Sequence, residues 1–408
     1  MSVDALLDSR LDVTGDVADW AKALPGGGGV YALSDEADRL VLLASGESLR
    51  RAITYRLAPP PEASRRRADL RSVVRRVRWR RTYSPFETAF EYHRAARIVL
   101  PDQYLEYCTF GPAWFVVVEP DACLPRLFVT KYLPSGSDQE ARAGQVCLGP
   151  FPTRATAERF VETLRDLFDL CRYHHILEQT PQGEPCAYHE MGKCPAPCNG
   201  SITLERYRAM MRAAAEFGAG QWRAHVPQWE KEMHTLAGAQ EFEKAGRIKQ
   251  RIGRAAWLAG RDLRLVRPIE RFSYLILQRG RGTTHIRPFF VRGGCVERGE
   301  EVSRRDLPEA AKTWLEVMTT PPAGQRDVDA ALQSEWIWLV SHYLFKGEAA
   351  AGLFLGADEW PNVEAWLERA RERIFRAGSS ARGRPADPTG PDAPCDGPSD
   401  RGDAPRAS

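Results

Sequence analysis

The spacing of hydrophobic residues in the first hundred positions changes between a period of two and a helical period. Residues 29–44 contain two apolar runs separated by a polar turn, which predicts a β-hairpin. Residues 47–57 and 84–100 have helical periodicity, and Ser84 is placed to cap the second helix. We therefore expect a small domain of strands and helices over residues 1–105.

Two strand-like runs follow at 113–120 and 126–133. The stretch 149–170 then enters a helix that leads the chain to Cys171. We expect residues 106–200 to form a second, cysteine-rich domain.

The next sixty residues have a helical pattern with short breaks. Ile248, Ile252 and Ala255 fall on one stripe of a helix, which is typical of an amphipathic helix packed on one side. We expect residues 201–265 to be a helical region.

The last third of the chain begins with strands and continues with helices. Residues 270–302 predict a meander of three short strands with glycine-rich turns. Helices are expected at about 306–318, 327–346 and 360–376. Together these elements indicate a partial β domain with helices over residues 266–376.

Residues 377–408 differ from the rest in composition. They consist largely of Pro, Gly, Asp and Arg with almost no apolar side chains, which predicts a disordered tail. The whole pattern therefore predicts an α+β multidomain protein with a disordered C-terminal segment.

The overall composition excludes several classes of protein. The chain has 408 residues, of which 43% are hydrophobic and 27% charged, as in ordinary soluble globular proteins. No apolar run reaches 18 residues, and the N-terminal sequence lacks the pattern of a secretory signal. No P-loop or dinucleotide-binding fingerprint is present. We expect a cytoplasmic protein that has no membrane partner and keeps its thiols reduced.

Arginines are concentrated in residues 65–81, which contain nine of them and a single acidic residue, Asp69. Val77 and Trp79 alternate with arginines, so the segment predicts a strand with one arginine face. Such a face could follow a phosphate backbone, and the alternative is a solvated surface. The DNA-binding candidates are Arg71, Arg75, Arg76, Arg78, Arg80 and Arg81.

Four of the nine cysteines lie within 28 residues, at Cys171, Cys186, Cys194 and Cys198. Structural zinc sites usually take ligands in pairs two to four residues apart, and only the last two cysteines have such spacing. An iron–sulfur cluster is larger and accepts less regular spacing. The spacing thus favours a cluster over zinc and leaves zinc and unliganded core thiols open.

Other thiols and imidazoles near this region have simpler interpretations. His174 and His175 lie between the first two cysteines of the set, and we expect them at the surface or behind the ligands. Four further cysteines lie in or beside apolar runs and are expected to be buried: Cys108, Cys123, Cys147 and Cys295.

The stretch "PCAYHEMGKCPAPC", preceded by a helix and by "LGPFP", resembles the cysteine-rich region of UvrC. UvrC is the C subunit of the bacterial nucleotide-excision-repair nuclease. In that family the four matching cysteines are understood to hold a 4Fe-4S cluster. The resemblance therefore implies such a cluster at the four positions named above.

Residues 230–252 are similar to the UVR motif of the same family, a helical hairpin that contacts UvrB. The resemblance implies UvrB as a partner. The partner-binding candidates are Met233, Phe242, Glu243, Ile248 and Ile252. The alternative is a generic helical hairpin.

The N-terminal domain resembles a GIY-YIG nuclease in which the catalytic positions are degenerate. Residues 29–31, Gly-Val-Tyr, match the first motif, but residues 42–45 read Leu-Leu-Ala-Ser where the family has its second. The family's catalytic arginine falls on Ala52, and its metal-binding glutamate falls on Tyr92. The remnants of a catalytic set are Tyr31, Arg50, Arg51 and Glu91.

The resemblance covers about residues 20–350 and ends before the RNase H-like and helix-hairpin-helix parts of UvrC. We expect a UvrC-like repair protein that binds DNA and UvrB, with endonuclease activity lost or impaired. One alternative is an active endonuclease with a rebuilt GIY-YIG site, the only case that requires a divalent metal. Another is a non-catalytic regulator that occupies UvrB.

Overall fold

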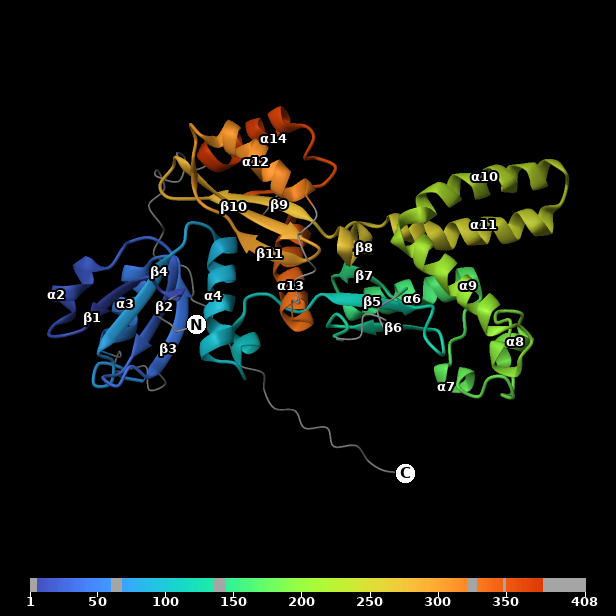
Figure 1. The fold of residues 1–408 in the computed structure, drawn as a ribbon, viewed down its shortest axis with the longest axis horizontal. Helices are drawn as coiled ribbons and strands as arrows, with labels where there is room; N and C mark the ends of the chain where they lie inside the picture. The colour runs from blue at the N-terminus through green and yellow to red at the C-terminus, as the bar shows by residue number, and fades with distance from the viewer. Residues whose placement is uncertain (1–5, 60–67, 136–143, 321–328, 348–349, 377–408) are drawn as a thin grey trace, which may run out of the picture.

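The computed structural model describes residues 6–59, 68–135, 144–320, 329–347 and 350–376. Within these residues the strands form three antiparallel sheets, each accompanied by helices, and the sheets follow one another along the chain (Figure 1). This arrangement confirms the predicted α+β multidomain fold. The predicted disordered tail at 377–408 lies outside the described residues.

The N-terminal sheet has the strand order β1-β4-β2-β3 and a helix on each side. Its elements are β1 (Ser9–Asp12), α2 (Val17–Trp20), β2 (Gly29–Ser34), β3 (Leu40–Gly46), α3 (Leu49–Leu57), β4 (Arg76–Arg81) and α4 (Pro85–Val99). The predicted hairpin of β2 and β3 is confirmed. Ser84 accepts a hydrogen bond from the Glu87 N–H at 3.1 Å, so it caps α4 as predicted.

The two faces of this sheet belong to different cores. Tyr31 on β2 packs with Trp79 and with the apolar side of α3. Its neighbour Val30 packs with Ala95 and the rest of the apolar side of α4. Successive residues of a strand point to opposite faces, so α3 covers one face and α4 the other.

The middle sheet has the order β6-β5-β7-β8. Its elements, with the helices that follow, are β5 (Trp114–Glu119), β6 (Arg126–Thr130), β7 (Val146–Phe151), α6 (Arg154–Phe168), α7 (His174–Leu177), α8 (Ala187–Glu190), α9 (Leu204–Glu216) and β8 (Arg267–Pro268). Leu148 and Gly149 of β7 pair with β8, which lies beyond residue 266. The middle sheet therefore takes its last strand from the segment that the sequence assigned to the next domain.

Two long helices leave the middle sheet as an antiparallel hairpin, α10 (Trp222–Gly238) and α11 (Phe242–Ala256) (Figure 1). The turn places Gln240 at φ 63°, in the left-handed region. The Glu241 N–H donates to the Leu236 carbonyl at 2.9 Å and closes the end of α10. The predicted helical hairpin is confirmed, and its similarity to the UVR motif stays a prediction.

The C-terminal sheet has the order β11-β10-β9-β13, and β12 pairs with β10. Its elements are β9 (Tyr274–Arg279), β10 (His285–Arg292), β11 (Cys295–Arg298), β12 (Val302–Ser303), α12 (Leu307–Thr319), α13 (Ala330–Lys346), β13 (Leu353–Gly356) and α14 (Val363–Ala370). Leu275 and Leu277 pack against α12 and α14 on one face. Ile276 and Phe289 pack against α13 and α4 on the other.

Helix α4 therefore belongs to two cores at once. Its Ala95 and Ala96 face the N-terminal sheet, whereas Phe86 and Phe90 face the C-terminal sheet. Figure 1 shows α4 between these two sheets. The N-terminal and C-terminal modules are thus joined through a shared helix.

Candidate functional site

The arginine strand β4 has the predicted alternation, but a second layer of protein covers its arginine face. Arg78 and Arg80 are the register partners of Ala32 and Val30, whose side chains face α4. Arg78 is only 3% exposed and donates to both carboxylate oxygens of Asp38, at 2.6 and 2.7 Å. The expected open strip of arginines is therefore interrupted at its centre, because ion pairs occupy this face.

Arg76 takes part in the same group of ion pairs. It lies 2.6 Å from Asp38 and 3.1 Å from Asp12. The hydrogen bond from Arg78, and then the one from Arg76, hold the pKa of the Asp38 carboxyl well below its usual range. These two arginines are ionic partners within the fold and are poorly placed to meet a phosphate backbone.

Three other arginines of the predicted set are exposed: Arg71, Arg75 and Arg81. Arg71 donates to both oxygens of Asp69, at 2.9 and 2.6 Å. The guanidinium of Arg81 lies 5.4 Å from the centre of the Tyr83 ring. Among the described residues of this segment, the exposed arginines therefore lie just before β4, at Arg71 and Arg75, and at its last residue, Arg81.

The remnants of the nuclease motif do not come together. Tyr31 is 2% exposed, and burial raises its pKa. Arg50 donates to the backbone carbonyls of Leu24 at 2.9 Å and Lys22 at 3.3 Å, so it fixes the loop before β2. Arg51 is exposed on the first turn of α3.

Glu91 lies on the other side of the sheet from Tyr31. Its carboxylate contacts Arg80 at 3.4 Å, Arg94 at 3.2 Å and Arg298 at 2.6 Å, and its side chain is almost fully buried. Arg80 projects toward the α4 face, whereas Tyr31 projects toward α3. A metal ion at Glu91 would therefore be separated from Tyr31 by the sheet.

The residue that aligns with the family's glutamate also has a structural role. Tyr92 is half-buried and packs in the apolar cluster between α4 and the N-terminal sheet. Burial raises its pKa to about 12. In the described part of the chain, no group of three or more His, Cys, Asp or Glu side chains is arranged to hold a single metal ion.

The four clustered cysteines lie in a loop that is held together by backbone hydrogen bonds. Cys171 follows α6, and its N–H donates to the Tyr207 hydroxyl at 3.1 Å. The Gly183 N–H donates to the Cys198 carbonyl at 2.9 Å. Nδ1 of His189 lies 2.9 Å from the Cys194 carbonyl. These contacts bring the first and last parts of the loop together.

The thiols in this loop influence one another electrostatically. A hydrogen bond from Cys194 lowers the pKa of Cys171, and the same contact, with burial, raises the pKa of Cys194. Burial raises the pKa of Cys198, and the neighbouring Cys186 adds to this effect. The fold thus gathers all four sulfurs in one region.

The histidines beside the loop remain at the surface, as predicted. His174 and His175 are exposed, and Nδ1 of His174 lies 3.2 Å from Glu178. Of the four cysteines expected to be buried elsewhere, Cys123 is exposed, whereas Cys108, Cys147 and Cys295 are partly buried. The prediction for Cys123 is wrong because this residue lies in the turn between β5 and β6, outside both strands.

The helical hairpin separates the five partner-binding candidates into two groups. Phe242 is 68% exposed at the first position of α11, and Glu243 beside it is also exposed. Ile248 and Ile252 pack partly against the core of the middle module, and Met233 is half-buried. The unpacked apolar surface therefore lies at the tip of the hairpin.

No helix in the part of the chain that the structure describes is both long and apolar enough to cross a membrane.

Comparison with known proteins finds a family match within the middle module. Residues 114–217, from β5 to the end of α9, match the family described as "UvrC/Cho excinuclease, middle domain". This range contains all four clustered cysteines. No solved structure matches the chain.

Several curated relatives carry the name UvrABC system protein C. The protein of Gloeobacter violaceus is 28% identical over 242 residues, which cover 56% of this chain and 35% of that protein. The protein of Desulforudis audaxviator is 32% identical over 130 residues, covering 31% and 19%. The protein of Acetivibrio thermocellus is 22% identical over 284 residues, covering 68% and 44%. The chain is UvrC-like and spans less than half the length of these relatives.

Proposed function

We propose that this UvrC-like chain takes part in nucleotide excision repair as a DNA- and UvrB-binding protein whose own GIY-YIG-like domain does not cut DNA. The observation that carries the proposal is the placement of Glu91. Its carboxylate is buried among three guanidinium groups and lies across the sheet from Tyr31. A phosphodiester-cleaving site needs an accessible carboxylate for the metal and a cation beside the reacting phosphate.

The cysteine loop fits a bound metal centre in its donor chemistry. Four thiols with no disulfide between them converge from two ends of one loop, and they are not arranged around a single ion. Free thiols suit either group, and the irregular spacing of the four cysteines in the sequence favours a cluster over zinc. Cys171, Cys186, Cys194 and Cys198 would hold a 4Fe-4S cluster, which would supply iron–thiolate bonds that cross-link the loop.

The tip of the α10–α11 hairpin supports a protein partner, and UvrB is the partner that the relatives' name suggests. Phe242 exposes most of an aromatic ring, and buried aromatic residues commonly anchor interfaces. Because Ile248 and Ile252 already contact the middle module, docking through the tip would leave the base of the hairpin in place.

DNA contact is assigned to the exposed cations Arg71, Arg75 and Arg81. The ion-paired arginines of β4 are expected to contribute little, because binding a phosphate would first require breaking their pairs with Asp38 and Asp12.

The test is an incision assay on a duplex with a single lesion, with UvrA, UvrB and magnesium. We expect the chain to bind the duplex and to leave it intact. Magnesium-dependent nicking that disappears in Glu91→Gln would contradict the proposal and support an active, rebuilt nuclease. Nicking that persists in both Glu91→Gln and Tyr31→Phe would indicate a contaminating nuclease, because both remnants would then be dispensable.

A further inference from the structure

The cysteine loop contains a short hydrogen-bonded unit that carries two of the four cysteines. This unit runs from residue 186 to residue 194 and includes α8. The His189 N–H donates to the Cys186 carbonyl at 2.8 Å, and the Lys193 N–H donates to the Tyr188 carbonyl at 2.8 Å. Nδ1 of His189 lies 2.9 Å from the Cys194 carbonyl. These bonds link the backbone around Cys186 to the backbone around Cys194.

One side chain of the 186–194 unit reaches back to the start of the loop. The guanidinium of Arg172, the residue directly after Cys171, lies 4.3 Å from the centre of the Tyr188 ring. The Tyr173 ring lies 5.8 Å from the same ring, measured between centres. Tyr188 therefore contacts the two residues that follow Cys171 and connects the 186–194 unit to that cysteine.

Arg172 is itself held by α6. Its Nη2 donates to the Asp166 carboxylate, and its Nε lies 3.6 Å from the Glu162 carboxylate. Only 9% of its side chain is exposed, and its Nη1 is buried without a hydrogen-bond partner. A guanidinium group attracts the face of an aromatic ring more strongly when little water surrounds it. The contact with the Tyr188 ring therefore offsets part of the cost of burying Arg172.

We propose that Arg172 and Tyr188 form a clasp that holds the cysteine loop ready for its metal centre. The Arg172–Tyr188 clasp connects Cys171 with the 186–194 unit, so it limits the separation of three ligands before the metal binds. Neither residue is a ligand, and both act by positioning the cysteines. Removing a residue that positions metal ligands commonly changes metal affinity about 10- to 100-fold. The proposal rests on the metal centre proposed above and applies equally to an iron–sulfur cluster and to zinc.

The length of the loop gives the physical reason for a clasp. Fourteen residues separate Cys171 from Cys186. A chain of this length has many conformations, and closing it around a metal costs conformational entropy. A contact that already joins the two ends lowers this cost at the moment of binding. We therefore expect loss of the clasp to speed the release of the metal and to leave the N-terminal and C-terminal modules unchanged.

The first experiment follows release of the bound metal from the intact chain to a coloured chelator, in the absence of oxygen. Tyr188→Ala and Arg172→Ala should each speed release about 3- to 30-fold, as expected for the loss of one buried contact between a cation and an aromatic ring. The double variant Arg172→Ala/Tyr188→Ala should release the metal no faster than Arg172→Ala, because both changes remove the same contact. Tyr188→Phe keeps the ring and should release the metal at nearly the wild-type rate.

Arg159→Ala is the matched control for this experiment. Arg159 lies on α6 of the same module, and its guanidinium lies 4.5 Å from the centre of the Trp257 ring, outside the loop. Its loss should not change metal release. Release from Tyr188→Ala at the wild-type rate would overturn the clasp, since the ring would then be dispensable. Equal acceleration in Tyr188→Phe and Tyr188→Ala would also overturn it, because the hydroxyl group would then be responsible.

The second experiment needs no bound metal. Hydrogen exchange of the full-length, metal-free chain is measured over the 186–194 unit. The His189 and Lys193 N–H groups should exchange faster in Tyr188→Ala than in wild type, and at nearly the wild-type rate in Tyr188→Phe. This result in a chain that binds neither iron nor zinc would reject the proposed metal centre and retain the clasp. Equal exchange in all three proteins, with metal bound and released equally, would reject the clasp and retain the metal centre.

Discussion

Glu87 is a buried carboxyl group at the junction of the N-terminal and C-terminal modules. Burial raises its pKa to about 7, and the nearby Arg287 opposes this shift. The Arg287 Nε lies 2.7 Å from Glu87, and its Nη2 lies 2.6 Å from Glu301. Two carboxylates therefore share one guanidinium group. Its charge only partly offsets the rise in the pKa of Glu87 that burial causes.

This raised pKa predicts a pH dependence of stability with a definite sign. Between the usual value of 4.5 and about 7, the folded chain holds a proton on Glu87 that the unfolded chain has lost. Stability from this group is therefore complete below pH 4.5 and is lost as pH rises to about 7. Urea unfolding at pH 5 and pH 8 should show wild type losing on the order of 2 kcal/mol relative to Glu87→Gln. If the stability of wild type and of Glu87→Gln changed equally between these pH values, the pKa of Glu87 would not be raised in the folded chain.

At the scale of single elements, local pattern predicted strand β4 but not its surroundings. Val77 and Trp79 alternate with arginines, which is enough to specify a strand. The acids that neutralise those arginines, Asp38 and Glu91, come from a hairpin turn and from α4. Alternation of polar and apolar residues cannot distinguish a solvated face from one covered by a helix with matching charges.

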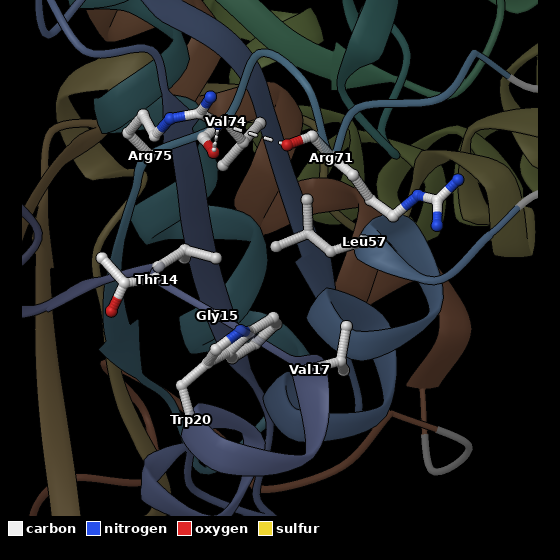
Figure 2. A pocket seen from close by; sticks show the side chains of 9 residues that line it. Thr14, Gly15, Val17, Trp20, Leu57, Arg71, Val74 and Arg75 are labelled. Carbon is white, nitrogen blue, oxygen red and sulfur yellow. Dashed lines mark hydrogen bonds between the residues drawn. The ribbon is translucent and has the colours of Figure 1, made fainter.

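The elements that sequence missed are short or depend on distant pairing. β1 and β13 have four residues each, and β8 has only two. Their strand character comes from partners elsewhere in the chain, such as Trp79 opposite Ser9. The cavity of about 340 Å³ beside Trp20 (Figure 2) could not be predicted from the sequence either, because its walls come from four segments that meet only in the folded chain.

The cysteine loop gives a prediction about metal content. Protein purified without oxygen should be brown and contain about four irons per chain. Cys194→Ser should lower the iron content and destabilise the middle module, because Cys194 is buried within the loop. Cys123→Ser is the matched control, since that thiol is exposed and lies outside the loop. Stoichiometric zinc with no iron in the same preparation would show that the loop holds zinc and would contradict the cluster.

The hairpin gives a second prediction at this scale. Phe242→Ala should weaken binding to UvrB by about 2 kcal/mol, because it removes an exposed aromatic anchor from the tip. The folded state should be unaffected, since the Phe242 ring has few contacts within the chain. Ile252→Ala serves as the contrasting variant, because Ile252 packs against the middle core and its loss should lower stability. If calorimetry gave equal UvrB affinity for wild type and Phe242→Ala, the proposed docking through the hairpin tip would be wrong. The hairpin would then serve only to pack against the middle module.

At the scale of the whole molecule, α4 connects two modules through buried hydrogen-bonded pairs as well as apolar contacts. Nε2 of His93 lies 2.8 Å from Glu335 on α13, and both side chains are almost fully buried. Arg298 on β11 lies 2.6 Å from Glu91. These pairs join residues more than two hundred positions apart in the sequence, so they can form only when both modules are folded and docked.

The coupling between the modules can be measured with a double-mutant cycle on Arg298 and Glu91. Glu91 is 2% exposed and Arg298 28%, so solvent screens the pair only partly. The unfolding free energies of wild type, Glu91→Gln, Arg298→Gln and the double variant should give a coupling of about 1–3 kcal/mol. The exposed pair Lys312–Glu309 on α12 is the matched control and should give less than about 0.5 kcal/mol. A coupling at Glu91 no larger than this control would mean that Arg298 does not hold the Glu91 carboxylate at the contact between the two modules. Glu91 would then pair only with Arg80 and Arg94 of its own module, and the sheet would still separate it from Tyr31.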